Sequence, residues 1–173
     1  VGQINAVEHH LPTIDLQHAQ VDPETGLLAA AAEEGLADAR RALRLVRSRA
    51  AEWKLDANAI GLMGFSAGGE LALLATTRAE AGRADDGDTV ERQSSRPNFV
   101  ALMYPGRVTR SDAVLTKDAP PVFVAAGSND TFVEPITQFY LAARKAGVSV
   151  ELHFYAGIGH GFGIRAEDPP AVK

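Results

Sequence analysis

Apolar residues recur along this chain with two spacings, one typical of helices and the other of buried strands. Leu36, Leu43 and Ala50 belong to a stripe at steps of three and four, which predicts an amphipathic helix ending near Trp53. Short uninterrupted apolar runs are typical of strands buried on both faces of a parallel sheet. The predicted strands are 60–65, 99–104 and 121–126, with an alternating strand at 148–154 and a weak one at 1–11.

Helical spacing returns between the strands, at 67–79 and 135–145. Strands that alternate with helices form parallel sheets. We therefore predict an α/β fold in which helices cover both faces of a mostly parallel sheet. The 173 residues suit one domain, residues 1–173. The polar stretch 82–97 is too short for a linker and is predicted to be an excursion loop.

Composition excludes several classes of protein. The net charge of −5 argues against nucleic acid as a partner, because nucleic-acid binding needs a basic face. No apolar run is long enough for a membrane span. The absence of cysteine excludes disulfides, thiolate metal sites and a cysteine nucleophile. The first residues lack the basic start and apolar run of a signal peptide, and the compartment stays open.

Gly64-Phe65-Ser66-Ala67-Gly68 is a G-x-S-x-G sequence between a predicted strand and a predicted helix. A serine at such a turn has a strained backbone, and the glycines two before and two after it prevent clashes. The turn exposes the hydroxyl and directs the first helix amides at a reacting carbonyl oxygen. The alternative is a tight turn with a helix-capping serine. The strand before it and the helix after it favour a nucleophile.

Two further polar residues follow predicted strands. Asp130 ends Gly127-Ser128-Asn129-Asp130, and His160 lies among glycines in 157–163. Site residues of open α/β sheets lie at the carboxyl ends of strands. Taken singly, Asp130 could form an Asx-turn and His160 could be a surface histidine. The order Ser66, Asp130, His160 is the chain order of one class of catalytic triad, and this coincidence favours the triad.

The remaining histidines and the acidic loop are expected to be solvated. His9 and His10 are adjacent and would point to opposite faces of a strand. His18 has no partner at metal-ligand spacing, and His153 alternates outward from the apolar face of its strand. The aspartates of the polar stretch miss the spacing of a calcium loop. They are Asp85, Asp86 and Asp88.

Together these motifs resemble the α/β-hydrolase superfamily. The likeness rests on Gly64-Phe-Ser-Ala-Gly-Gly69, on Gly127-Ser-Asn-Asp130 and on Gly159-His-Gly-Phe162, with Tyr104-Pro105 in addition. More narrowly, they resemble the small, capless carbohydrate-esterase and dienelactone-hydrolase-like branch, which includes acetyl-xylan-esterase-type enzymes. The likeness covers residues from about 33 to 165.

The resemblance implies a role for each site residue. Ser66 would be the nucleophile, His160 the general base and acid, and Asp130 the group that orients the histidine. Ala67 N–H would donate to the oxyanion. The family normally has an HGGG-type glycine loop and further strands before this region, and this chain contains no such loop. We therefore expect a domain truncated at its amino-terminal side, with the second oxyanion donor unassigned.

The expected function is hydrolysis of short-chain acyl esters, of the acetyl type, by a serine esterase that forms an acyl-enzyme. Its partner would be a small-molecule ester, with no metal, cofactor, nucleic acid or membrane. Two alternatives stay open: a serine peptidase similar to prolyl oligopeptidase, and a truncated hydrolase domain with little or no activity. Because the strand before Ser66 lacks its usual neighbour, we also expect a homo-oligomer, most simply a dimer.

Overall fold

Four parallel strands form one sheet in the order β1-β2-β3-β4 in the computed structural model, which describes residues 27–109 and 115–163. The strands are β1 (Gly61–Phe65), β2 (Phe99–Met103), β3 (Val122–Gly127) and β4 (Val150–Tyr155). The helices are α1 (Leu27–Ser48), α2 (Ala50–Trp53), α3 (Ala67–Thr77) and α4 (Val133–Lys145). The strands, α3 and α4 confirm the predicted elements to within two residues at each end. The strand predicted at 1–11 lies outside the described residues.

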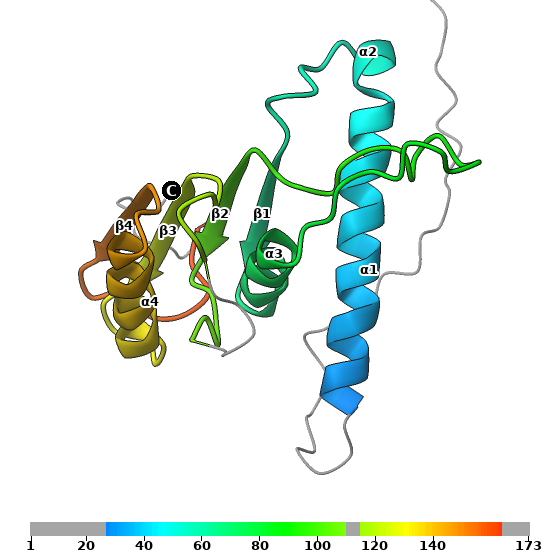
Figure 1. Ribbon diagram of the computed structural model, residues 1–173. Helices are drawn as coiled ribbons and strands as arrows, with labels where there is room; N and C mark the ends of the chain where they lie inside the picture. Colours follow the sequence, from blue (N-terminus) through cyan, green and yellow to red (C-terminus); the bar gives the residue numbers. More distant parts are fainter. Residues whose placement is uncertain (1–26, 110–114, 164–173) are drawn as a thin grey trace, which may run out of the picture.

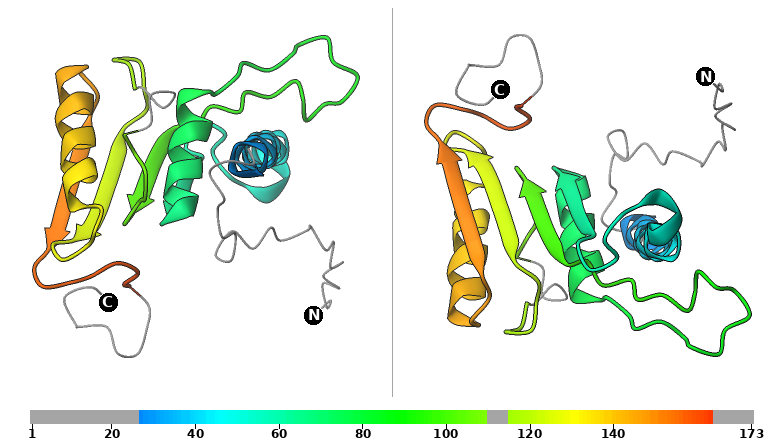
Figure 2. Two further views of the ribbon diagram at one scale, coloured as in Figure 1. Left: turned by 90° about the horizontal axis from the view of Figure 1, so that it is seen from below. Right: turned by 90° about the horizontal axis from the view of Figure 1, so that it is seen from above.

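Helices α3 and α4 cover the same face of the sheet (Figures 1 and 2). Val100, Leu102 and Val124 point from the strands into the core on this face. Leu73 of α3 and Ile136 of α4 belong to the same cluster of buried residues. Each strand lies next to the one before it in the chain, so right-handed crossovers bring every connecting helix to one side.

Within residues 27–109 and 115–163, nothing covers the opposite face of the sheet over β1 and β2. Met63 is 59% exposed, and Phe65 and Phe99 are each 50% exposed. We predicted helices on both faces and a first strand buried on both sides. In the described part of the chain the helices cover one face, and β1 is an edge strand. The apolar run of β1 shows that its side chains are hydrophobic but does not show what covers them.

Helix α1 lies beyond α3, at the β1 side of the sheet (Figures 1 and 2). Leu36 packs with Leu74 and Ala75 of α3 in a second cluster of buried residues. Trp53, predicted to continue the apolar stripe, is about half exposed. The four-residue α2 ends at Trp53, and the left-handed backbone of Lys54 (φ 58°) caps it. Although α1 has 22 residues, neither it nor any other described helix has the length and apolarity needed to cross a membrane.

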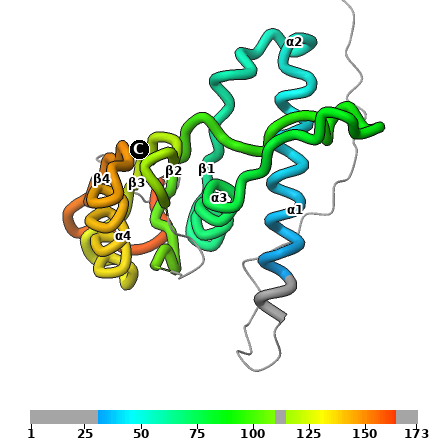
Figure 3. Tube along the Cα trace, in the orientation of Figure 1, coloured from blue at the N-terminus to red at the C-terminus, as the bar shows by residue number. Residues whose placement is uncertain are grey.

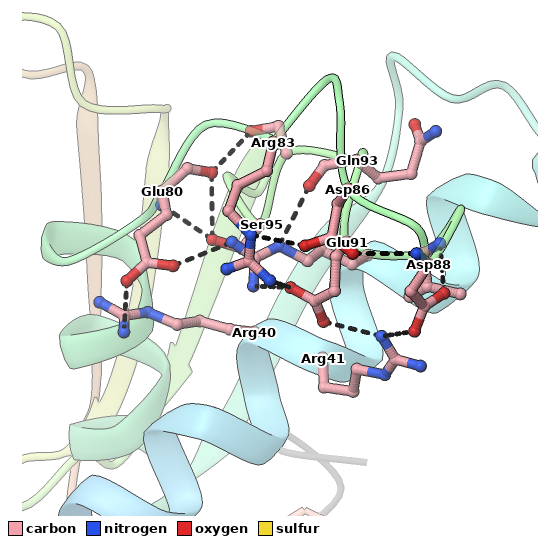
Figure 4. Close-up of polar contacts among 12 residues, drawn as sticks. Arg40, Arg41, Glu80, Arg83, Asp86, Asp88, Glu91, Gln93 and Ser95 are labelled. Carbon is pink, nitrogen blue, oxygen red and sulfur yellow. Dashed lines mark hydrogen bonds and ion pairs between the residues drawn. The ribbon is translucent and has the colours of Figure 1, made fainter.

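The polar stretch before β2 runs from the end of α3 across α1 and back to the sheet (Figure 3). Arginines of α1 hold it there (Figure 4). Nη1 of Arg41 lies 2.8 Å from a carboxylate oxygen of Asp88 and 2.7 Å from one of Glu91. Ser95 in the same stretch is fully buried. The predicted excursion loop is therefore docked on the helix, because arginines outside the apolar stripe of α1 bind it.

Arg44 is the most buried of the arginines on α1, with 6% of its side chain exposed. Its guanidinium lies 2.9 Å from the carboxylate of Glu80 and 3.0 Å from that of Glu91, and its Nε donates to the Gln93 carbonyl at 3.1 Å. The hydrogen bond from Arg44 lowers the pKa of the Glu80 carboxyl. The contribution of Glu80 to stability is therefore complete above the ordinary carboxyl pKa and is lost as pH falls through the lowered value.

Replacing Arg44 tests how much this contact stabilises the fold. Arg44→Met should lower the free energy of unfolding by about 2 kcal/mol, because it leaves the Gln93 carbonyl without its donor and removes a buried ion-pair partner of Glu80 and Glu91. Urea denaturation measures the change. Arg49→Met is the matched control, because Arg49 pairs with Glu52 at an exposed site and should contribute less than about 0.5 kcal/mol. Equal effects of the two substitutions would contradict the prediction.

Candidate active site

Ser66 occupies the turn between β1 and α3, with a backbone conformation (φ 50°, ψ −119°) that non-glycine residues rarely adopt. Its N–H donates to the Met103 carbonyl at 3.0 Å, which ties the turn to β2. The turn is tight because the first turn of α3 folds back over β1. A Cβ on Gly64 would lie 2.0 Å from the carbonyl oxygen of Gly68, so only glycine fits at position 64.

The second glycine of the motif has a different role from the one predicted. A Cβ on Gly68 would meet nothing within 4 Å. A Cβ on Gly69 would instead lie 2.8 Å from the Cβ of Pro105, in the segment after β2. The glycine that allows another segment to pack closely against α3 is therefore Gly69 and not Gly68. The five-residue pattern cannot show this, because the neighbouring segment comes from another part of the chain.

Asp130 lies between β3 and α4, and its side chain is completely buried. Its Oδ1 accepts a hydrogen bond from Phe132 N–H at 2.9 Å, which is an Asx-turn. Its Oδ2 lies 2.8 Å from Nδ1 of His160. Asp130 therefore forms an Asx-turn and also binds His160, because each of its carboxylate oxygens has its own partner.

His160 comes from the loop after β4, which lies directly against the end of β3. Asn129 N–H donates to the Ile158 carbonyl at 2.9 Å, so the two loops are joined through their backbones. A Cβ on Gly127 would lie 2.1 Å from the same carbonyl oxygen, which explains the glycine that ends β3. Nε2 of His160 lies 2.7 Å from Oγ of Ser66.

The structure thus brings the three predicted residues into one hydrogen-bonded chain, from Asp130 through His160 to Ser66. An ionised carboxylate can only accept, so Nδ1 of the imidazole donates to Asp130. In a neutral imidazole Nε2 then has a free lone pair and accepts the Ser66 hydroxyl proton. This arrangement can remove a proton from the serine oxygen. Ala67 is the first residue of α3, where amides have no acceptor within the helix.

Two aromatic rings lie against the imidazole. The ring centroid of Tyr104 is 5.1 Å from that of His160 in an edge-on arrangement, and that of Phe132 is 5.6 Å away. The sequence indicates Tyr104 only through the family resemblance. Its position directly after a strand is the signal that could have placed it at this edge of the sheet.

No group of three histidine, aspartate or glutamate side chains within 27–109 and 115–163 is arranged to hold a metal ion. Of the other histidines, His153 is exposed beside Glu151 on β4. His9, His10 and His18 lie outside the described residues.

Sequence comparison supports the resemblance. A model of the BD-FAE family matches residues 17–104. The acetylxylan esterase of Xylanibacter ruminicola is 28% identical, in an alignment that covers 73% of this chain and 31% of that protein. The chain therefore spans less than a third of this relative.

Comparison with solved structures also finds esterases and related hydrolases. The acetyl ester-xyloside bifunctional hydrolase from Caldicellulosiruptor lactoaceticus is 33% identical with a TM-score of 0.68, over 73% of this chain and 56% of that one. Esterase 2 of Thermogutta terrifontis, phosphorylated by paraoxon, is 28% identical with a TM-score of 0.62, over 79% of this chain and 56% of that one. These similarities confirm the α/β-hydrolase type of fold.

The two glycines of the motif should differ in their tolerance of alanine. Gly64→Ala should lower the free energy of unfolding by more than about 3 kcal/mol, because the backbone carbonyl of Gly68 occupies the space of the new methyl group. Gly68→Ala should leave it unchanged or raise it by up to about 1 kcal/mol, since alanine favours a helix more than glycine does. Thermal unfolding followed by circular dichroism compares the two variants. Similar losses of stability in the two variants would show that the contact between position 64 and the Gly68 carbonyl does not restrict the turn to glycine.

Proposed function

This chain belongs to the BD-FAE family, and from that premise we propose that it is a serine esterase for short-chain acyl esters. The observation that supports the proposal most directly is the hydrogen-bonded chain Asp130–His160–Ser66. The proposed substrate is a small ester of the acetyl type, because both an acetylxylan esterase and an acetyl ester hydrolase are similar to this chain.

In the proposed reaction, Oγ of Ser66 attacks the ester carbonyl carbon while Nε2 of His160 takes the hydroxyl proton. Asp130 holds the imidazole in its tautomer and stabilises the imidazolium. The carbon–oxygen bond to the alcohol then breaks, and His160 gives its proton to the departing alcohol oxygen. The acyl group remains on Ser66 as an ester.

Water completes the cycle. It attacks the acyl carbon while His160 takes one of its protons, and the carboxylic acid leaves as that proton returns to Oγ of Ser66. In both halves the carbonyl oxygen becomes an oxyanion, to which we assign Ala67 N–H as a donor at the start of α3. Every step uses side chains, backbone and water, without a metal or cofactor.

Ser66→Ala tests the nucleophile. It should reduce turnover of p-nitrophenyl acetate by about 10⁴-fold or more, because it removes the attacking oxygen. It should also abolish covalent labelling by a fluorophosphonate probe. Ser149→Ala is the control, because Ser149 is an exposed serine before β4 and should keep both activity and labelling.

The outcomes separate the alternatives. A Ser66→Ala variant that keeps most of its turnover would overturn the assignment of the nucleophile. A wild-type chain that neither hydrolyses esters nor takes the probe would favour the inactive hydrolase domain. Faster cleavage of peptide amides than of esters would favour the peptidase.

We also propose that the chain forms a homo-oligomer, most simply a twofold dimer. Within the described residues β1 has no neighbouring strand on its outer side. Such an edge presents unpaired backbone groups. The exposed Met63, Phe65 and Phe99 beside it support an interface, because apolar patches of this kind commonly mark one.

Sedimentation equilibrium over a dilution series tests this assembly. The wild-type chain should sediment at twice its mass of 18.3 kDa. Met63→Glu should raise the dissociation constant by about tenfold or more, because it puts a charge into the apolar patch. Leu141→Glu is the matched control, since Leu141 is 53% exposed on α4, which covers the other face of the sheet. A folded wild-type monomer at micromolar concentration would overturn the proposal.

A further inference from the structure

The segment directly after β2 packs closely on the first turn of α3. Gly106 N–H donates to the carbonyl of Ser66 at 3.3 Å, so the segment is bonded to the turn that holds the proposed nucleophile. Pro105 lies in close contact with Gly69, as described above. The segment is therefore both bonded to the start of α3 and packed against it.

Tyr104 begins this segment in a backbone conformation that is costly for a side chain, with φ 36°. Its N–H donates to the Ala125 carbonyl at 2.6 Å, which ties it to β3. Residues keep such conformations only when their surroundings determine them, and these residues concentrate at functional sites. The contacts on both sides of Tyr104 are therefore what keeps it in place.

The Tyr104 ring lies between the two halves of the site. Its centroid is 5.8 Å from that of Phe65, next to Ser66, and 5.1 Å from the imidazole of His160, with an interplanar angle of 70°. It is also 5.0 Å from Phe162, in the loop that carries His160. An edge-on aromatic contact of this kind restricts the orientation of the imidazole.

Glu70 fixes the far end of the same segment. Its Oε1 accepts a hydrogen bond from Arg107 N–H at 2.7 Å. A Cβ on Gly106 would lie 2.1 Å from the same oxygen, so the chain passes Glu70 as closely as a glycine allows. Glu70 stands in the first turn of α3, where the helix dipole favours a carboxylate. The proposed reaction gives this carboxylate no role.

We infer that Glu70 is a positioning residue: by binding Arg107 N–H it fixes the segment 104–107 and so holds the Tyr104 ring against His160. The inference rests on the proposed esterase function. Glu70 does not contact the proposed reacting atoms; it acts through Tyr104. A glutamate that only stabilised the helix would affect folding and leave the rate of the chemical step unchanged.

The experiment measures kcat and KM for p-nitrophenyl acetate in variants of Glu70. Glu70→Ala should reduce kcat by about tenfold or more and change KM by less than about threefold, because the substitution acts on the orientation of the imidazole. Glu70→Gln keeps an acceptor oxygen and should stay within about threefold of wild type. Glu134→Ala is the matched control, because Glu134 is the exposed acidic residue in the first turn of α4.

A double-mutant cycle tests whether Glu70 acts through Tyr104. Tyr104→Gly should fold readily, because glycine accepts a positive φ, and should lose kcat to the same degree. Adding Glu70→Ala to Tyr104→Gly should change kcat by less than about threefold, since the two act through one contact. The inference fails if the wild-type chain hydrolyses the ester and either Tyr104→Gly or Glu70→Ala keeps the wild-type kcat. The proposed esterase function would stand in that case. If the wild-type chain neither turns over esters nor takes the fluorophosphonate probe, the proposed function fails and this inference with it.

Discussion

Parallel pairing of the strands is the constraint on which the whole site depends. Because β1, β3 and β4 run in the same direction, their carboxyl ends meet at one edge of the sheet. Ser66, Asp130 and His160 each lie within five residues of the end of their strand. Short loops are enough to bring the three side chains together. The backbone hydrogen bonds between the strands of the sheet hold these loops in position.

The site is held by backbone contacts as much as by side chains. The carbonyl of Gly68 lies where Gly64 would carry a Cβ, and the carbonyl of Ile158 does the same at Gly127. One contact closes the turn at Ser66, and the other presses the His160 loop against β3. Together with the buried carboxylate of Asp130, they leave the imidazole little freedom to move away from the serine.

Local signals were enough to predict the strands, the helices and the hydrogen-bonded chain of Ser66, His160 and Asp130. Each is encoded by a short pattern of apolar residues with a polar residue at a strand end. What the sequence could not show depends on contacts between distant segments. Arg44 looks like a solvated residue of α1 until the loop before β2 is docked on it. Met63 looks like a core residue in the sequence, but its side chain lies on the face of the sheet that α3 and α4 do not cover.

The sequential order of the strands has a consequence for how the chain folds. Each strand pairs with the one synthesised just before it, so the sheet can grow from β1 to β4 without waiting for a distant segment. The turn that carries Ser66 forms at the end of β1, whereas His160 arrives only with the loop after β4. A nascent chain that has emerged as far as β3 therefore carries the proposed nucleophile without its proposed base, and Ser66 gains the hydrogen bond to His160 only when β4 has docked.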